Sequence, residues 1–170
     1  ATEFSKLVVF QGKLLVVDGP SGSIWSSTDG VNWGAPIITN APWMGRDGFG
    51  VVSFKNKLWI IGGQSFGPQY YNDIWQWDGI LPVNFVHVDT DPTSFGIQDA
   101  PWTARNVPEV LVFNNKLWVI GGVQIQQSNI FFTDMWYSTD GATNWTYAGQ
   151  IPTATSVPEL FGYRVAPLND

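Results

Sequence analysis

Two arginines, each preceded by a tryptophan, are the residues of this chain that point most directly to chemistry. Trp43 is followed by Arg46, and the same pair returns as Trp102 and Arg105 in a second copy of the surrounding sequence. A guanidinium presents a planar fork of donors that can hold a carboxylate or a sulfate through two bonds. These four residues are therefore candidates for an anion-binding ring around a common axis. The alternative is structural: each arginine stacks on its tryptophan and donates to backbone carbonyls. Repetition at equivalent positions favours that alternative.

A third arginine, Arg164, follows Arg105 at the spacing that separates the first two, and would suggest a carboxylate-binding triad. However, residues 157–159 copy residues 107–109, and this alignment places Arg164 opposite Asn114. The even spacing is therefore coincidental, and we reject the triad.

The chain contains few other residues that could support catalysis or bind a metal ion. His87 is the only histidine and cysteine is absent, which excludes thiolate sites, disulfides and multi-histidine metal sites within this chain. Asp89, Asp91 and Asp99 suggest Ca²⁺, but the positions between them do not follow the EF-hand pattern. A pair of carboxylates for glycosidase chemistry stays open, although no carboxylate stands out. We assign no catalytic residue, no metal ligand and no cofactor.

Aromatic rings beside neutral amides form the second group of candidate binding residues. They fall in three long connections, expected at residues 62–73, 89–104 and 121–134. Long, irregular connections are where binding sites usually lie. Aromatic rings beside amide groups suit contact with a protein or a carbohydrate. The alternative is that the rings pack the loops onto the sheets. The candidates are Phe66, Gln69, Tyr70, Gln124, Gln126 and Phe131, with Gln127, Asn129 and Ile130 beside them.

The sequence segments that must position these residues form an internal repeat. Residues 56–63 (NKLWIIGG) return as residues 115–122 (NKLWVIGG), and residues 12–19 are a weaker first copy. A turn pair, a β-branched and aromatic run and a diglycine predict a hairpin turn, a strand and the exit from that strand. The chain is therefore a repeat protein.

Each repeat contains four strand-like pieces and none of the 3.6-residue periodicity of a helix. A four-stranded antiparallel unit that recurs in this way predicts an all-β fold built from propeller blades. Trp59, Trp118, Trp75 and Trp136 are expected to pack between adjacent blades. The expected strands are residues 4–10, 14–17, 24–27 and 33–39, then 49–54, 58–61, 74–77 and 84–88, then 107–113, 117–120, 135–138 and 145–148.

The strand that ends in Gly-Gly, with Tyr71 six residues ahead of Trp77, resembles the kelch repeat of β-propellers, including the central domain of galactose-oxidase-like proteins. The resemblance implies a kelch-like propeller whose repeats bind partners. A copper-radical oxidase of the galactose oxidase kind would need cysteine and several histidines. Residues 27–33 and 138–145 also resemble the Asp-box hairpins of sialidase-type propellers, and we interpret them as turns without catalytic meaning.

Composition limits the class of protein further. The 170 residues carry a net charge of −6 with only 8 basic residues, which makes a surface that follows nucleic-acid phosphates improbable. No apolar run is long enough to span a membrane. The chain opens with Ala1 instead of Met, so we expect that a leader or upstream region has been removed, and an exported or extracellular protein is favoured.

The repeats define one domain, residues 1–170, that holds only part of a propeller. We expect blade 1 at about residues 1–40, blade 2 at 41–99, blade 3 at 100–150 and the first strand of a fourth blade at 151–170. Three blades and one strand cannot close a ring, since propellers have about four to eight blades. The ring is therefore expected to be completed by the rest of a longer chain or by homo-oligomerisation.

These observations predict a non-catalytic interaction or assembly module of kelch type, which binds a protein partner through its long connections. A carbohydrate-binding or carbohydrate-modifying propeller of an exported protein is the first alternative, and a structural repeat of a fibre, sheath or tail is the second. Replacing Trp118 with alanine should cost about 3–5 kcal/mol of stability if the indole is buried.

Overall fold

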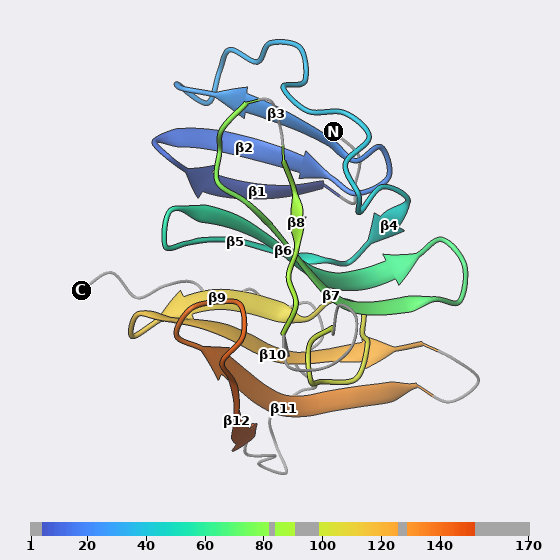
Figure 1. Ribbon diagram of the computed structural model, residues 1–170. Coiled ribbons are helices and arrows are strands. Elements are labelled where there is room, and N and C mark those ends of the chain that lie inside the picture. The colour runs from blue at the N-terminus through green and yellow to red at the C-terminus, as the bar shows by residue number, and fades with distance from the viewer. Residues whose placement is uncertain (1–4, 82–83, 91–98, 126–128, 152–170) are drawn as a thin grey trace.

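The computed structural model describes residues 5–81, 84–90, 99–125 and 129–151, and it consists of strands and turns (Figure 1). The all-β prediction is confirmed, because this part of the chain contains no helix. None of its elements is a helix of the length and apolarity that crossing a bilayer requires. The expected first strand of a fourth blade falls at residues 152–170, outside the described residues.

Sheet A is formed by the N-terminal strands β1 (Ser5–Phe10), β2 (Lys13–Asp18) and β3 (Ser23–Ser27) in that order, all antiparallel. A fourth strand was predicted at residues 33–39, but only a single bridge forms there. Ile38 accepts a bond from the Ile24 amide at 3.0 Å and returns one at 3.4 Å. Pro36 has no N–H to donate, so a continuous ladder cannot form along this segment.

Sheet B is the central sheet, and β6 pairs with both β4 and β5 along one edge and with β7 along the other. The fourth predicted strand is shorter than expected, because β8 covers two residues only. The strands are β4 (Arg46–Asp47), β5 (Gly50–Phe54), β6 (Lys57–Ser65), β7 (Tyr70–Trp77) and β8 (Val86–His87).

Sheet C repeats this arrangement with four antiparallel strands in the order β12-β11-β10-β9. Its first and fourth strands lie close to their predicted positions. The strands are β9 (Glu109–Phe113), β10 (Lys116–Gln124), β11 (Ile130–Ser138) and β12 (Trp145–Gln150).

Two of the three predicted two-residue turns between the first two long strands of each repeat are confirmed, and the third is displaced by one residue. Gln11-Gly12, Lys55-Asn56 and Asn114-Asn115 connect the first two long strands of sheets A, B and C, and all six residues have positive φ. Positive φ at both central positions is the geometry of a type I′ hairpin turn, which Asn and Gly tolerate. In sheet B the turn is one residue earlier than the predicted Asn56-Lys57.

The diglycines do not end the strands, as the sequence pattern had predicted. β6 and β10 continue to Ser65 and Gln124, with register irregularities at Ile61/Gly63 and Ile120/Gly122. Gly63 has a φ of 101°, and a Cβ on it would lie 2.5 Å from the Asp47 carbonyl oxygen. The pair is therefore a β-bulge that only glycine can form. Two of the expected long loops are instead the ends of extended hairpins.

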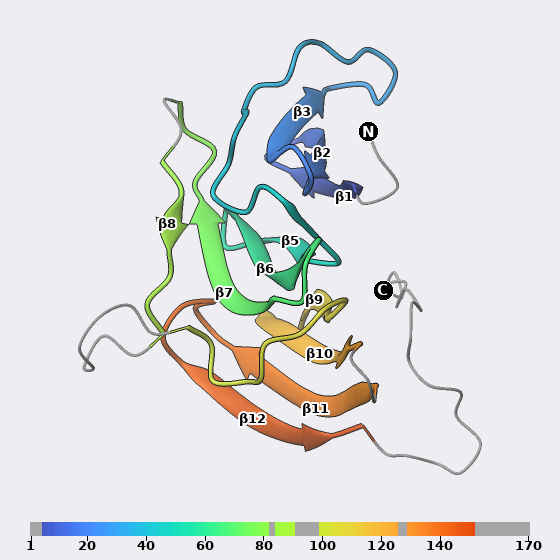
Figure 2. The same cartoon turned by 90° about the vertical axis from the view of Figure 1, so that its right-hand side faces the viewer.

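The three sheets fan around a common axis and pack face to face (Figure 2). Near this axis the first long strand of sheet B, β5, contacts both β1 of sheet A and β9 of sheet C, while β8 and β12 lie far from the axis. One apolar core lies between sheets A and B and contains Leu15, Val17, Leu58 and Ile60; a second lies between sheets B and C and contains Trp59, Ile61, Leu117 and Val119. Alternate residues of β6 thus serve different cores, as the two-residue period of a strand requires.

The four tryptophans expected between blades have different environments. Trp59 is 1% exposed in the core between sheets B and C, and Trp136 is half-buried against that core. Trp75 packs on the other core and stacks on His87 at 4.6 Å between ring centroids. Trp118 is only half-buried, because it lies on the face of sheet C that no described sheet covers. The prediction of a buried Trp118 is therefore wrong for the part of the chain that the structure describes.

Candidate functional site

Arg46 lies at 5% exposure inside sheet B and is fully engaged there. Its guanidinium donates to both carboxylate oxygens of Asp73, at 2.7 and 3.0 Å, and to the Gly62 carbonyl at 3.1 Å. The guanidinium carbon lies 3.9 Å from the centroid of the Tyr71 ring. β4 supplies the arginine, the diglycine bulge supplies the carbonyl, and β7 supplies the aspartate and the ring.

Arg105 repeats every one of these contacts in sheet C, at 1% exposure. It holds Asp134 through both guanidinium nitrogens, donates to the Gly121 carbonyl at 2.9 Å, and lies over Phe132 at 4.1 Å. Burial by itself would raise the pKa of Asp134, but the hydrogen bonds from Arg105 and Trp136 outweigh it and lower that pKa. The carboxylate therefore stays charged opposite the arginine.

These pairs favour the structural interpretation of the repeated arginines. A bidentate fork already bound to an internal carboxylate has no remaining geometry for a ligand carboxylate or sulfate. The ring under each arginine is Tyr71 or Phe132, and not the preceding tryptophan that the sequence suggested. Trp43 and Trp102 are 0% and 3% exposed and pack edge-on against other rings of the cores.

Sequence reasoning missed the two aspartates, although a signal for them exists. Asp73 and Asp134 each stand two residues after the ring under the arginine and two before a tryptophan. Residues two apart on a strand share a face, so ring, carboxylate and indole line up. The indole nitrogens of Trp75 and Trp136 donate to these carboxylates at 2.7 Å each. The recurrence of an aspartate at the same position of the second and third repeats therefore indicated a partner for the recurring arginine.

The remaining candidates gather at the ends of two neighbouring hairpins, β6–β7 and β10–β11 (Figure 1). Phe66 and Gln69 lie in the first hairpin's turn, and Phe131 lies on β11. Tyr70 connects the two hairpins: its hydroxyl donates to the Ile125 carbonyl at 2.7 Å and accepts from the Ile125 amide at 2.6 Å. These two hydrogen bonds fix the spacing between the hairpins, and they give Tyr70 a structural role.

The amide side chains contribute less than expected. Gln124 donates to the Ala104 carbonyl at 2.6 Å, so its amide supports the hairpin. Gln126 lies outside the described residues. What the hairpin ends do present is apolar: Phe66, Ile125, Ile130 and Phe131 are 62%, 51%, 46% and 43% exposed. We call these four residues the hairpin-end surface.

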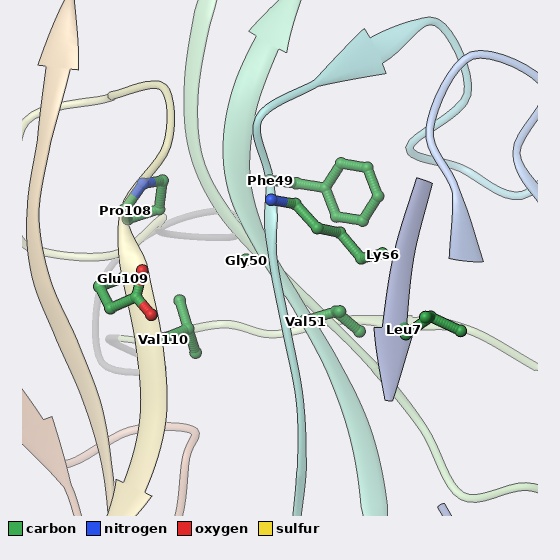
Figure 3. Close-up of a pocket in the computed structure, with 8 residues that line it drawn as sticks. All are labelled: Lys6, Leu7, Phe49, Gly50, Val51, Pro108, Glu109 and Val110. Carbon is green, nitrogen blue, oxygen red and sulfur yellow. The ribbon is translucent and has the colours of Figure 1, made fainter. Parts of the chain in front are cut away.

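A cavity of about 190 Å³ lies near the axis, where β1, β5 and β9 approach one another (Figure 3). Lys6 and Glu109 line opposite sides of it, with an aromatic and aliphatic wall between them. The other lining residues are Leu7, Phe49, Gly50, Val51, Pro108 and Val110. Opposite charges on two walls do not select for an anion or a cation, so we assign no ligand to this cavity.

The histidine and the acidic residues do not form a centre of chemistry in the described chain. His87 lies 3.0 Å from Asp99 in an exposed pair beside Trp75. Asp91, one of the three expected Ca²⁺ ligands, is outside the described residues. Among the residues that are described, no three His, Cys, Asp or Glu side chains come close enough to share a metal ion.

Comparison with known proteins supports the kelch resemblance. Residues 45–78, which contain β4 to β7, match the family model described as "Kelch motif". The fold is similar to that of the β-propeller reported as "Structure of YjhT", with a TM-score of 0.69 and 14% sequence identity. No curated protein matches the sequence. The similarity covers 88% of this chain but only 52% of that one. The chain thus has a β-propeller fold with a segment that matches the kelch motif, and it spans about half the length of this structural neighbour.

Proposed function

We propose that this chain is a non-catalytic interaction module of kelch type, which binds a protein partner through the hairpin-end surface. The observation that carries the proposal is that four large apolar side chains are exposed at the ends of two adjacent hairpins that Tyr70 holds together. Several exposed large apolar side chains in one region favour an interaction site.

The chemistry of the surface favours a protein over a small charged ligand. Two phenylalanines and two isoleucines provide the kind of anchors that occupy pockets in protein interfaces. The repeated arginines, which would have favoured an anionic ligand, are bound to their own aspartates. Because the hairpins are tied at their ends, little conformational freedom has to be lost when a partner binds.

A carbohydrate ligand is the second candidate, and one observation favours it. Phe66 and Gln69 are exposed within the same four-residue turn, where a ring for stacking on a sugar and an amide for its hydroxyls stand together. A glycan would use Phe66 and Gln69, whereas a protein partner would cover both hairpins.

The experiment is a binding comparison between the wild-type chain and the double variant Phe66→Ala/Phe131→Ala. Partners captured by the immobilised wild-type chain are identified and then titrated against each variant. Loss of at least tenfold in affinity, about 1.4 kcal/mol, is expected for the double variant. Ile80→Ala is the matched control, since Ile80 is 65% exposed in a turn outside both hairpins.

Two outcomes would contradict the proposal. A partner that binds the double variant as well as the wild-type chain would use another surface. Saturable binding to a glycan array that Phe66→Ala or Gln69→Ala abolishes, and Phe131→Ala does not, would assign the turn to a carbohydrate instead.

A further inference from the structure

The interface between sheets B and C is built around one tryptophan seated on one glycine. Trp59 of β6 donates its indole N–H to the Phe54 carbonyl at 2.9 Å, which fixes the ring on the face of sheet B. Gly141, in the turn before β12, receives that ring: a Cβ on this glycine would lie 2.7 Å from a ring carbon of Trp59. No other residue type leaves room for the indole at this position.

The glycine is presented by a rigid turn. Asp140 accepts bonds from the Ser138 hydroxyl at 2.7 Å and from the Ala142 amide at 2.8 Å. The Ser138 oxygen in turn accepts the Gly141 amide at 2.8 Å. The sheet B–sheet C interface is therefore a tethered indole on one face and a turn held by its own aspartate on the other.

The uncovered face of sheet C carries the first half of this arrangement again. Trp118 occupies in β10 the position of Trp59 in β6, and its indole donates to the Phe113 carbonyl at 3.1 Å. Trp118 packs sideways on Tyr137, with 5.1 Å between ring centroids, but no described sheet lies over it. Phe113 is 58% exposed, whereas its equivalent Phe54 is 4% exposed.

The uncovered face of sheet A carries the second half. Asp29 accepts bonds from the Ser27 hydroxyl and from the Val31 amide, both at 2.9 Å, and Ser27 accepts the Gly30 amide at 2.9 Å. The turn therefore has the bonds of the Gly141 turn. Among the described residues, a Cβ on Gly30 would meet nothing closer than Leu14, at 3.9 Å, so they leave open the place that corresponds to the indole site on Gly141.

We propose that a second copy of this chain docks between these two faces, with Trp118 of each copy seated on Gly30 of the other. The inference rests on the repeated interface and does not depend on the hairpin-end surface. Each contact joins two different faces, sheet C of one copy and sheet A of the other. In a dimer the two contacts are related by a two-fold axis and close the assembly, whereas the same faces joined without closure would continue as a filament.

The expected number of copies in a closed ring follows from how much of a known propeller this chain matches. The aligned part of this chain covers 52% of the YjhT propeller, so two copies supply the sheets of one complete ring of that size. Closure at two copies also removes both uncovered faces at once. Side chains that become covered include Leu7 and Val9 of β1 and Val31 and Trp33 of the connection after β3, which are 58%, 68%, 79% and 36% exposed in one copy.

The test is the mass of the 170-residue chain in solution across a dilution series, measured by sedimentation equilibrium. We expect a monomer–dimer equilibrium that reaches twice the mass of one chain and goes no further. Trp118→Ala should weaken dimerisation at least tenfold, about 1.4 kcal/mol. Gly30→Asn should do the same from the other side, because asparagine tolerates the left-handed backbone but fills the seat.

Controls separate lost docking from lost folding. Each variant is compared with the wild-type chain by circular dichroism and by its melting temperature at a concentration where both are monomeric. Phe66→Ala should dimerise as the wild-type chain does, which keeps this result independent of partner binding. A monomer at every concentration, a filament, or a dimer unaffected by Trp118→Ala and Gly30→Asn would each overturn the proposal.

Discussion

Trp59 and Trp118 occupy the same position in two copies of one repeat and have different environments. Both indoles donate to the carbonyl at the end of the preceding strand, at 2.9 and 3.1 Å. Trp59 is 1% exposed under sheet C, whereas Trp118 is half-buried on a face that no described sheet covers. Their burial therefore differs because of the neighbouring sheet, since the local sequence and the local hydrogen bond are the same.

The two turns that could receive these rings differ in the same way. Gly141 lies against Trp59, and Gly30 lies in an equivalent turn with an open surface. Sheet C thus carries an uncovered indole, and the turn after β3 of sheet A carries an uncovered glycine. Where sheets B and C meet, an indole and a glycine of these two kinds combine in a core; at the two ends of the array they remain apart. Four experiments test how far this difference explains stability.

The largest expected effect is on Trp59. Trp59→Ala should lower the free energy of unfolding by about 3–5 kcal/mol, because it removes a fully buried indole and leaves a cavity. Trp118→Ala should cost about 1 kcal/mol in the monomer, where one side of the ring faces solvent. Urea unfolding at a concentration below the dimerisation range measures both. Equal losses would mean that Trp118 is covered within one chain.

The next effect concerns the two arginine–aspartate pairs, whose side-chain bonds recur in sheets B and C, although the Arg105 backbone also bonds to Tyr71 and Gly63 of sheet B. Asp73→Ala and Asp134→Ala each leave a buried arginine without its partner, and each should cost about 3 kcal/mol. The two losses should agree within about 1 kcal/mol, because Arg46 and Arg105 make the same contacts. A much smaller loss for one of them, in urea unfolding, would show that its pair depends on the adjoining sheet.

A smaller effect is expected at the two glycines. Gly141→Ala should cost about 2–4 kcal/mol, from a strained positive φ and from overlap with the Trp59 ring. Gly30→Ala should cost about 1–2 kcal/mol in the monomer, from the backbone alone. Thermal unfolding of both variants gives the difference. If Gly30→Ala costs as much stability as Gly141→Ala, the space above Gly30 is already filled by another part of the same chain.

The smallest effect is the acid sensitivity of the two turns. Burial would raise the pKa of Asp140, but bonds from Ser138, Ala142 and Asn144 lower it, and bonds from Asn32, Val31 and Ser27 lower the pKa of Asp29. A carboxyl group whose pKa is lower in the folded chain stabilises the fold above its unfolded pKa of about 3.9. That stabilisation is lost as the pH falls below this value and through the folded pKa.

Carboxyl NMR titration of the monomer should therefore place both aspartates below the ordinary range. Asp29→Asn and Asp140→Asn should each reduce the fall in stability on acidification. An ordinary pKa for Asp29 together with a low one for Asp140 would show that the turn on sheet A needs a covering sheet to form.

Much of the fold could be predicted because its signals are local. The turns Gln11-Gly12 and Asn114-Asn115 need residues that accept positive φ, and the sequence provides them between apolar runs. The diglycines were misread for the opposite reason. A Gly-Gly pair predicts both a strand end and a β-bulge, and the choice depends on the backbone of Asp47 and Asn106 that packs against Gly63 and Gly122.

The candidate site was harder to predict, because its partners are distant in the sequence. The repetition of Arg46 and Arg105 favoured a structural role but did not indicate which residues each arginine would contact. The aspartates lie on β7 and β11, and the rings under the guanidiniums are Tyr71 and Phe132. Which ring and which acid meet the arginine depends on hairpin register and on the bulge, which shifts that register.

The sequence by itself determined the repeat, the strands, the turns and the positions of the two tryptophans, because these follow from backbone preferences and from alternation along each strand. Tertiary structure decided which tryptophan is buried, which glycine receives it and which acid neutralises each arginine. Burial depends on what lies opposite a side chain, and two nearly identical segments acquire different environments when only one of them has a neighbouring sheet.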